Sequence, residues 1–462
     1  MIPMRRLWLA GALTLLSAPA MCAETIEYPA LGTLTIYRPA QPAKEFVIFV
    51  SGDGGWNLGV VDMAQHLVDQ GAFVVGVDIR QMGKRALASS ESCISGAATF
   101  ETLSHFVQQK YGMQHYESPI LVGYSSGATV VYTTLAQSPV GTFKGALSLG
   151  FCPDLEWSKP FCRGEGLEND PGRKVGFVYR PATHLRDPWI ALQGDMDQVC
   201  DAGQTGKFLA QVPGAEIVNL PKVGHGYSVE KNWVPQFLDA YHRIADTSDL
   251  PRPALPSGVN DLPLVELPAS GTEKDLFAIM LSGDGGWAGL DREVAAELNA
   301  RGVPVVGWDS LRYFWDARTP GGAAGDLDRI IRHYVQAWHK SRVLLIGYSQ
   351  GADTMPFMVN RLPEESRRMV KATALIAPSN EAFFEFHVSH WLGTPAGGLP
   401  TAPEVTSGRM GPVACVYGKD EEDSPCRKLH GPDLRSITLP GGHHFDGNYA
   451  GVAQAILAAL PP

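Results

Sequence analysis

Two serines in this sequence stand within the pattern Gly-x-Ser-x-Gly. Ser125 lies within Gly123–Gly127 (GYSSG), and Ser349 lies within Gly347–Gly351 (GYSQG). The pattern is typical of a sharp strand-to-helix turn that exposes the serine hydroxyl as a nucleophile, because larger flanking side chains would clash there. Each copy follows an apolar run and precedes a helix-like segment, which is the context that the motif requires. The sequence therefore predicts two nucleophilic serines.

A serine hydroxyl is a poor nucleophile without a base, and the base needs a carboxylate that orients it. In the chain order typical of such hydrolases, the acid follows a later strand and the histidine comes last. In the first half of the chain, Asp197 follows the apolar run Trp189–Gln193, and His225 lies farther on between two glycines. Ser125, Asp197 and His225 are therefore a possible triad.

The second half offers a choice of acids. Four carboxylates follow the apolar run Val413–Tyr417, and three of them are candidates for the acid: Asp420, Glu421 and Asp423. Asp197 stands three residues before Cys200, and Asp423 stands three residues before Cys426. We therefore pair Asp423 with Asp197, which requires a two-residue insertion, and expect Asp423 to be the acid.

The second half also offers two adjacent histidines as the base, His443 and His444. His443 directly follows a glycine and stands two residues before an aromatic side chain, as His225 does. We therefore favour His443 over His444. The expected triad of this half is Ser349, Asp423 and His443.

The string Ser-Gly-Asp-Gly-Gly-Trp occurs twice, at Ser51–Trp56 and at Ser282–Trp287, each time after an apolar run. Hydrolases place at this point the loop that supplies one N–H of the oxyanion hole, and the residue after the nucleophile supplies the other. A phosphate-binding loop is the alternative, but neither Gly-x-Gly-x-x-Gly nor a Lys-Ser/Thr ending is present. The expected oxyanion-hole residues are Asp53, Ser126, Asp284 and Gln350.

Several residues of the second half could contact a substrate. Asp284 could receive a cationic group, or it could stabilise its own turn by bonding the local backbone. The run Tyr313–Trp315 (YFW) follows a predicted strand and has no counterpart in the first half. It could form a ligand-facing wall or could pack a loop. The candidate substrate contacts are Asp284, Trp287, Tyr313 and Trp315.

The repeated motifs predict two copies of one domain. In each half, short apolar strands alternate with amphipathic stretches, a pattern that indicates a mostly parallel sheet flanked by helices. Residues 246–260 are rich in proline, serine and aspartate without an apolar period, which is typical of a linker. We expect an α/β protein with a first domain over 24–245 and a second over 261–462.

The bulk composition limits the compartment and the partners. The net charge of −10 and the absence of a basic run argue against a nucleic-acid partner. Arg5, Arg6, the apolar stretch Leu7–Ala18 and the small residues after it predict a secretory signal peptide over 1–23. No later segment approaches 18 apolar residues, so no transmembrane segment is expected in the mature protein.

The cysteines agree with export. The first half after the signal contains Cys93, Cys152, Cys162 and Cys200, and the second contains Cys415 and Cys426. An even number in each half favours disulfides within each domain, but the first half allows three pairings. No paired Cys or Cys/His spacing indicates zinc, so we expect no metal and no cofactor.

The second half resembles the bacterial VirJ/AcvB family. The resemblance rests on Ser282–Trp287, Tyr313–Pro320 (YFWDARTP), Gly347–Asp353 (GYSQGAD) and Gly441–Asp446 (GGHHFD), and it covers the chain from about Asp261 to the C-terminus. It implies tandem α/β-hydrolase domains, a periplasmic location, and association with virulence and secretion. It also implies hydrolysis of the ester that joins alanine or lysine to phosphatidylglycerol, with this aminoacylated phospholipid bound at the membrane surface.

Two other functions remain open on the sequence alone. One is a different periplasmic esterase or lipid acyl hydrolase. The other is a non-catalytic protein, associated with virulence or secretion, whose repeat binds a partner. Complete Ser/Asp/His sets in both halves favour an enzyme.

Overall fold

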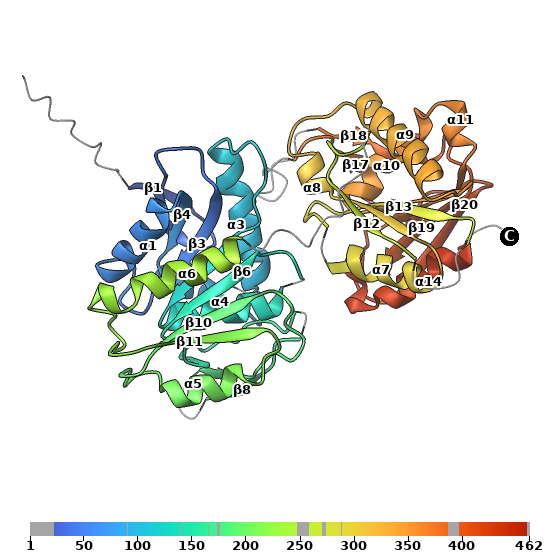
Figure 1. Cartoon of the computed structure of the whole chain (residues 1–462). Coiled ribbons are helices and arrows are strands. Elements are labelled where there is room, and N and C mark those ends of the chain that lie inside the picture. The colour runs from blue at the N-terminus through green and yellow to red at the C-terminus, as the bar shows by residue number, and fades with distance from the viewer. Residues whose placement is uncertain are drawn as a thin grey trace, which may run out of the picture.

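The fold is that of a computed structural model, which describes residues 23–89, 91–138, 140–164, 166–172, 176–246, 258–269, 274–287, 289–386 and 397–459. The predicted signal peptide and most of the predicted linker lie outside the described residues. The described chain forms one eight-stranded and one seven-stranded sheet, each with helices on both faces (Figure 1). The expected class, two tandem mostly parallel α/β units, is confirmed.

The first sheet is parallel except at one edge, where β2 runs antiparallel to both of its neighbours. Its inner strands are apolar runs whose residues are almost all buried, as is usual for parallel strands covered on both faces. From edge to edge the strands are β1 (Glu24–Tyr28), β2 (Gly32–Tyr37), β4 (Ala72–Val77), β3 (Glu45–Val50), β5 (Ile120–Tyr124), β6 (Gly145–Leu149), β10 (Trp189–Gly194) and β11 (Ala215–Leu220).

Two apolar layers hold the first sheet between its helices. One face is covered by α1 (Gly59–Asp69) and α6 (Val234–Ala245). The opposite face is covered by α2 (Ile79–Ala88), α3 (Gly96–Lys110), α4 (Ser126–Gln137) and α5 (Ala202–Leu209). Between β6 and β10 the chain forms a small sheet of β7 (Asp154–Leu155), β9 (Phe177–Tyr179) and β8 (Asn169–Pro171).

The second sheet repeats this order without a counterpart of β1 among the described residues. Its first strand, β12, pairs antiparallel with β14, and the other pairs are parallel. From edge to edge the strands are β12 (Leu264–Leu267), β14 (Val305–Trp308), β13 (Phe277–Leu281), β15 (Val343–Tyr348), β16 (Val370–Ile376), β19 (Val413–Gly418) and β20 (Leu434–Leu439). A separate short pair is formed by β17 (Glu381–Ala382) and β18 (Leu399–Pro400).

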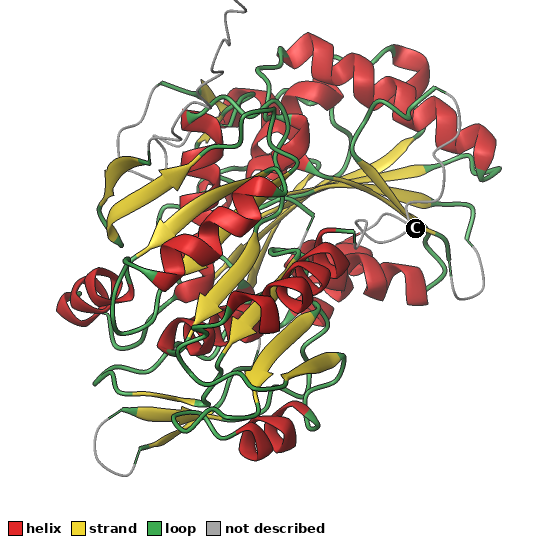
Figure 2. Cartoon of the chain, turned by 60° about the vertical axis from the view of Figure 1, so that its left-hand side comes forward, coloured by secondary structure: helices red, strands yellow, loops and turns green. Residues whose placement is uncertain are grey.

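The second sheet is also a layer between helices, and Figure 2 shows its twisted strands passing between them. One face packs against α7 (Gly289–Ala300) and α14 (Tyr449–Ala459). The other packs against α8 (Ser310–Tyr313), α9 (Pro320–Ala337), α10 (Gln350–Asn360) and α13 (Thr401–Val405), with α11 (Glu364–Arg367) against α9. In both units, the loops that carry the motifs lie at the carboxyl ends of the central strands.

Three disulfides form within the described chain, and each stays within one unit. Cys93 pairs with Cys162, and Cys152 pairs with Cys200, which resolves the pairing that the sequence left open. Cys415 pairs with Cys426 and closes the short loop after β19. The expectation of intradomain disulfides is confirmed.

The two units touch through α3 and the segment after it. Gln109 of α3 donates a hydrogen bond from Nε2 to the carbonyl oxygen of Phe386 at 2.7 Å. Trp315 donates from Nε1 to the carbonyl oxygen of Met113 at 2.8 Å and stacks on the Phe386 ring. Figure 1 shows α3 of the first unit on the side that faces α8 of the second. The first unit therefore contacts the second through the loops that contain Trp315 and Phe386.

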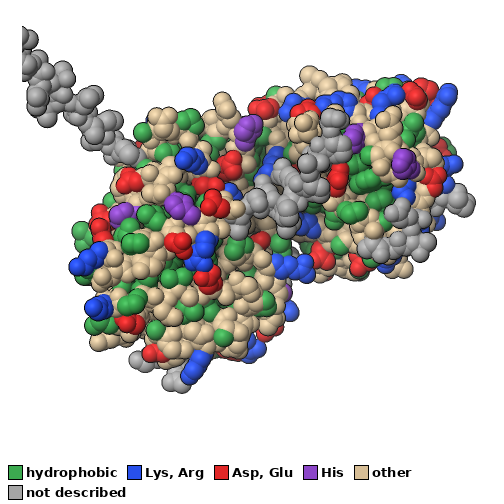
Figure 3. Space-filling view, viewed as in Figure 1, with side chains coloured by type: hydrophobic (Ala, Val, Ile, Leu, Met, Phe, Trp, Pro, Cys, Tyr) green, Lys and Arg blue, Asp and Glu red, His purple; other side chains and the backbone are tan. Residues whose placement is uncertain are grey.

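The surface is charged and mixed in sign. On the face seen in Figure 3, acidic and basic side chains are interspersed over both units. Among the described residues, none of the helices combines the length and apolarity that a bilayer span requires.

Candidate active site

Both motif serines lie at strained turns between a strand and a helix. Ser125 joins β5 to α4 with φ of 55° and ψ of −124°, and Ser349 joins β15 to α10 with φ of 49° and ψ of −117°. A Cβ atom at Gly123 would lie 2.1 Å from the carbonyl oxygen of Gly127. At Gly347 the corresponding distance is 2.3 Å. The glycines of the motif are therefore required sterically, and each serine hydroxyl stands at the carboxyl edge of its sheet.

The first unit brings its three predicted residues together. His225 Nε2 lies 2.9 Å from Ser125 Oγ, and His225 Nδ1 lies 2.8 Å from Asp197 Oδ2. Asp197 Oδ1 accepts hydrogen bonds from the backbone N–H groups of Val199 and Cys200, both at 2.9 Å. These bonds fix the carboxylate in a buried position. The geometry is that of a nucleophile, a base and an orienting acid.

The second unit has the same geometry with a different acid. His443 Nε2 lies 3.0 Å from Ser349 Oγ, and His443 Nδ1 lies 2.8 Å from Glu421 Oε1. Glu421 Oε2 accepts a hydrogen bond from the backbone N–H of Gly418 at 2.7 Å. Burial alone would raise the pKa of Glu421, but the bonds from His443 and Gly418 outweigh burial and lower it. Glu421 is therefore held as a carboxylate that can stabilise a protonated His443.

The expectation that Asp423 orients the base is wrong. The carbonyl oxygen of Asp423 accepts a hydrogen bond from Asn380, and Glu421 occupies the place beside His443. Glu421 comes three residues after Gly418, the last residue of β19, as Asp197 comes three residues after Gly194 of β10. The two-residue insertion therefore follows the acid. Counting from the strand end rather than from the cysteine would have identified Glu421.

Of the two adjacent histidines, the one favoured from the sequence faces the serine. His444 turns the other way, and its Nδ1 lies 2.9 Å from the hydroxyl of Tyr348. Burial lowers the pKa of His444, and the neighbouring His443 lowers it further. His443 thus has the position of the base, and His444 packs behind it.

The elements of an oxyanion hole lie next to each serine. Ser126 and Gln350 are the first residues of α4 and α10, so their N–H groups have no carbonyl one turn earlier to pair with. On the other side, Gly52 and Gly283 of the repeated string approach the serines, and Cβ atoms placed there would lie 3.0 and 3.4 Å from the serine Cβ atoms. Asp53 and Asp284 follow these glycines directly. Both sites can thus present N–H groups to a developing oxyanion.

Carboxyl groups gather around the string of the second unit. Glu101 comes from α3 of the first unit, and its Oε1 would lie 3.1 Å from a Cβ atom at Gly285. Burial raises the pKa of Glu101 to about 8, and the charge of Asp284 contributes. Burial also raises the pKa of Asp353, again with a contribution from Asp284. No pattern in the sequence points to Glu101, because it lies in the other half of the repeat.

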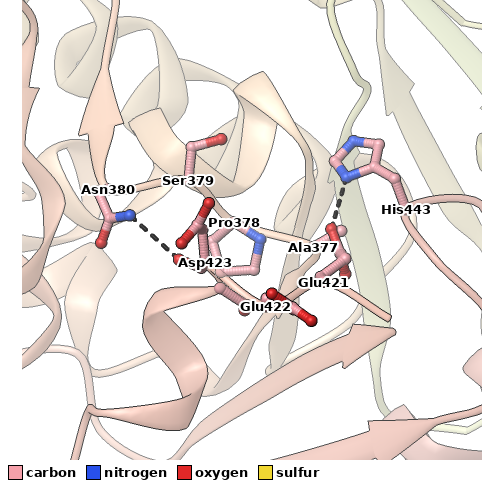
Figure 4. A pocket seen from close by; sticks show the side chains of 9 residues that line it. Ala377, Pro378, Ser379, Asn380, Glu421, Glu422, Asp423 and His443 are labelled. Carbon is pink, nitrogen blue, oxygen red and sulfur yellow. Dashed lines mark hydrogen bonds and ion pairs between the residues drawn. The ribbon is translucent and has the colours of Figure 1, made fainter. Parts of the chain in front are cut away.

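A cavity of about 260 Å³ opens beside His443 and the acidic loop after β19 (Figure 4). Its lining includes the carboxylates Glu421, Glu422 and Asp423. The loop after β16 contributes Ala377, Pro378, Ser379 and Asn380 to the lining. Ser424 and the base His443 complete it. The volume suits a small organic group, and the lining suits a cation.

Three of the four predicted substrate contacts have other roles. Trp287 is buried, and its ring fills the space beside Gly307 where a Cβ atom would lie 2.5 Å from it. Tyr313 is buried too and donates its hydroxyl to Asp326 at 2.7 Å. Trp315 contacts the first unit through its bond to the Met113 carbonyl. These aromatic residues pack loops and the interface between the units, whereas Asp284 remains beside the site.

Within the described residues, one group of potential metal ligands lies in the first site: Asp197, Cys200 and His225. The Sγ atom of Cys200 is bonded to Cys152, and the other two side chains bond each other. A disulfide sulfur is not a thiolate ligand, so this group does not fit a metal ion.

Comparisons with known proteins reach both halves of the chain. A family model described as bacterial virulence protein (VirJ) matches residues 44–145 and 275–461, more than half of the chain. Among solved structures, an esterase domain from Rhodothermus marinus is 15% identical, with a TM-score of 0.34, over 48% of this chain and 98% of the other. A dienelactone hydrolase from Anabaena variabilis is also 15% identical, with a TM-score of 0.34, over 48% of this chain and 94% of the other. No curated protein matches this chain.

Proposed function

This chain belongs to the VirJ family of bacterial virulence proteins, and we propose that it is a periplasmic serine hydrolase that cleaves the aminoacyl ester of aminoacyl-phosphatidylglycerol. The products are the free amino acid, alanine or lysine, and phosphatidylglycerol. The observation that carries the proposal is the Ser349–His443–Glu421 arrangement with carboxyl groups on both sides of it.

The reaction follows from the positions of these side chains. Ser349 Oγ attacks the aminoacyl carbonyl carbon while His443 takes the hydroxyl proton, and Glu421 stabilises the resulting imidazolium. The oxyanion receives hydrogen bonds from the N–H groups beside Gly283 and at Gln350. The ester C–O bond then breaks, and His443 returns the proton to the phosphatidylglycerol oxygen. A water molecule then attacks the acyl-enzyme and gives a proton to His443. The bond to Ser349 Oγ breaks, the amino acid is released, and His443 returns the proton to Ser349 Oγ.

The second unit is the better candidate for this reaction. The family match covers Ser349, Glu421 and His443. In the first unit it covers Ser125 but ends before Asp197 and His225. The family relationship therefore supports the second site as the one that performs the proposed reaction.

The charge around Ser349 supports an aminoacyl substrate. In the sheet order, β13 and β19 lie on opposite sides of β15, which leads into Ser349. Asp284 follows β13 with Glu101 beside it, and the acidic loop from Glu421 follows β19. An ammonium group on the amino acid would therefore meet carboxyl groups on either side of the reacting carbonyl, an arrangement that stabilises a cation.

A cationic substrate would also be stabilised by Glu101, whose pKa is raised by burial and by Asp284. Near neutral pH, Glu101 holds a proton because it is partly buried and lies close to Asp284. A bound ammonium group would offset the repulsion between the two carboxyls and favour the charged form of Glu101. Glu101 and Asp284 thus suit a cationic ligand better than a neutral one.

The proposed location rests on the N-terminal segment and the cysteines. The predicted signal peptide would export the chain, and disulfides such as those within each unit persist in an oxidising compartment. A compartment that borders the membrane is also where an aminoacylated phospholipid would be met.

The test is to incubate the purified protein with vesicles that contain alanyl- or lysyl-phosphatidylglycerol and to measure the released amino acid. We expect release by the wild type and a loss of about 10⁴-fold or more in Ser349→Ala, because this change removes the nucleophile. Absence of release from both lipids by the wild type would overturn the proposed substrate.

A second measurement separates the remaining alternatives. If the protein is another esterase, Ser349→Ala in a Ser125→Ala background abolishes the remaining cleavage of simple esters although neither aminoacyl lipid is cleaved. If it is a non-catalytic binding protein, a fluorophosphonate probe leaves Ser349 unlabelled and no ester is cleaved. Peptide mass spectrometry of the probe-treated protein distinguishes these results.

A further inference from the structure

We propose that the triad of the first unit is a second, independent catalytic centre, which hydrolyses carboxylic esters of uncharged, apolar acyl groups. This activity goes beyond the proposed aminoacyl reaction and does not depend on it. Three sets of observations carry it: the assembled triad, the apolar side chains that surround it, and the charges beside its oxyanion loop.

The first triad has every interaction that the chemistry needs. Its serine-to-histidine and histidine-to-acid distances, 2.9 and 2.8 Å, match those of the second site. Its acid is held by more bonds, because Gln193 Nε2 also donates to Asp197 Oδ2 at 3.1 Å. The strained φ of Ser125 is kept as well. A domain with only a structural role has no need of this strained turn together with a buried, fully bonded acid.

Exposed apolar side chains lie on loops at the same edge of the sheet as this triad. Leu58 is 83% exposed, Val199 67% and Met196 62%, which are the three highest values among the large apolar side chains of the described residues. Leu58 ends the loop that carries the repeated string, and the other two flank Asp197. All three belong to loops at the carboxyl edge of the first sheet. Exposed apolar groups on separate loops around a nucleophile indicate a surface for an apolar ligand.

The second site replaces each of these side chains. When the repeats are aligned on the strand ends Gly194 and Gly418, Met196 corresponds to Asp420 and Val199 to Asp423. When they are aligned on the repeated string, Leu58 corresponds to Gly289. We call the residues at these positions the rim of each site. The rim is apolar in the first unit (Leu58, Met196 and Val199), and in the second unit it contains Asp420 and Asp423, although the triads are alike.

The string of the first unit is also surrounded by less negative charge than the string of the second. In the first unit, the Arg80 guanidinium lies over the string, and a Cβ atom at Gly55 would be 1.9 Å from its Nη2. Asp53 accepts a hydrogen bond from the Ser126 hydroxyl at 2.6 Å, which partly satisfies its charge. The position of Asp353 is taken by Thr129, which bonds a backbone carbonyl. Arg80 is paired with Asp78 through hydrogen bonds at 3.2 and 2.8 Å, so it adds no net charge beside the string, and an uncharged acyl group would meet the apolar side chains here.

The proposed reaction is a complete ester hydrolysis. Ser125 Oγ forms a bond to the acyl carbon as its proton moves to His225 Nε2. The ester C–O bond breaks, and the alcohol leaves with that proton. Water then attacks the acyl-enzyme, gives a proton to His225, and releases the carboxylic acid as the proton returns to Ser125 Oγ. Water is the only co-reactant.

The test uses full-length protein and p-nitrophenyl butyrate, an uncharged ester of an apolar acyl group. We expect Ser349→Ala protein to keep cleaving this ester. We expect the Ser125→Ala/Ser349→Ala double variant to lose at least about 100-fold of that activity. A fluorophosphonate probe should label the peptide that contains Ser125. The proposal is overturned if Ser349→Ala alone removes the activity, if the double variant keeps it, or if Ser125 is not labelled.

A variant of the exposed apolar residues tests the acyl-group class without replacing a triad residue. Met196→Asp/Val199→Asp in Ser349→Ala protein copies the side chains of the second site, and we expect KM for p-nitrophenyl butyrate to rise about 10-fold from lost apolar contact. Leu87→Asp, which alters an exposed leucine on α2, is the matched control and should leave KM unchanged. An unchanged KM in the rim variant would reject the acyl-binding surface.

The two proposals fail separately. If butyrate hydrolysis requires Ser125 but nothing is released from aminoacyl-phosphatidylglycerol, the proposed function is rejected and the first-unit centre stands. The reverse pattern, with aminoacyl release through Ser349 and no Ser125-dependent cleavage, would reject only the second centre.

Discussion

The two Ser-His-acid arrangements of this chain differ in the loops that border them and hardly at all at their centres. Each has a serine at a left-handed turn, a histidine within 3.0 Å of it and an acid within 2.8 Å of that histidine. Around Ser125 the rim is apolar, with Arg80 beside the oxyanion loop. Around Ser349 the rim is acidic, and Glu101 of the other unit contributes to it.

This difference separates catalysis from selectivity. The strained turn, the helix start and the loop glycines are fixed by the backbone, so duplication of the domain preserves them together. The rim side chains sit on loops that tolerate substitution, so each copy can adapt to a different ester. The contact between the units adds asymmetry, because α3 of the first unit borders the site of the second.

The largest expected effect on activity comes from replacing Glu421, the acid of the second triad. Glu421→Gln should lower kcat for aminoacyl release by about 10⁴-fold, because an amide favours the wrong tautomer of His443 and does not stabilise its protonated form. Steady-state release of the amino acid measures it. Asp423→Asn is the matched control, and an equal loss there would restore Asp423 as the acid and remove the correspondence between Glu421 and Asp197.

Next in size are the disulfides, which brace the acid loops differently. Cys152–Cys200 spans 48 residues and ties the acid loop of the first unit to the loop after β6. Cys415–Cys426 spans 11 residues and ties β19 to the turn that follows the acid loop of the second unit. Replacing either pair by serine should cost about 2–4 kcal/mol of stability, more for the longer span. Thermal unfolding measures it. Removal of each disulfide should lower only the activity that depends on the serine of the same unit. If the activity of the other unit's serine also falls, the two centres are coupled.

The selectivity of the second rim gives a smaller effect. Glu101→Gln/Asp284→Asn should raise KM for lysyl-phosphatidylglycerol about 10- to 100-fold, since charge-assisted contacts with the ammonium group are lost. Ser349-dependent cleavage of an uncharged ester, measured in a Ser125→Ala background, should change far less. Glu91→Gln, which alters an exposed acid of the first unit, serves as the control. Equal effects on both esters would indicate a general disturbance of the site.

The smallest effect concerns stability and pH. The pKa of Glu101 is about 8 in the folded protein against an ordinary value of 4.5. Between these values the folded state holds a proton that the unfolded state has lost, so this group lowers stability as pH rises. After allowance for partial exposure, Glu101→Gln should gain about 1 kcal/mol at pH 8, or about 2–4 °C in Tm, and nothing at pH 4.5. A gain that stays constant across this pH range would contradict an origin in the titration of Glu101.

Much of the architecture could be predicted from the sequence because it depends on local patterns. The apolar runs that became β3, β5, β13 and β15 are continuous and bounded by glycine-rich strings, so both their type and the alignment of the two repeats follow from residue order. Ser125 and Ser349 are predictable because their glycines are required by backbone contacts. His225 and His443 are predictable because each follows a glycine in a late loop.

The remaining site residues could not be placed in this way. The spacing from the cysteine points to Asp423 instead of Glu421, because the disulfide loops of the two units differ in length and partners. Trp287 ends the repeated string and Tyr313 follows a strand, which predicts substrate contacts, yet the rings of both are buried in the core. Proximity in sequence does not say which way a side chain points.

Residue order and local backbone geometry are thus enough to predict two α/β units, each with a serine, a histidine and an oxyanion loop. The folded chain was needed to find that Glu421 meets His443 and that Glu101 from α3 borders the second site. It was needed, too, to find that Leu58, Met196 and Val199 are exposed around the first triad. Those facts depend on how separate loops converge at the edge of a sheet and on how two units pack, and neither is encoded in a local pattern.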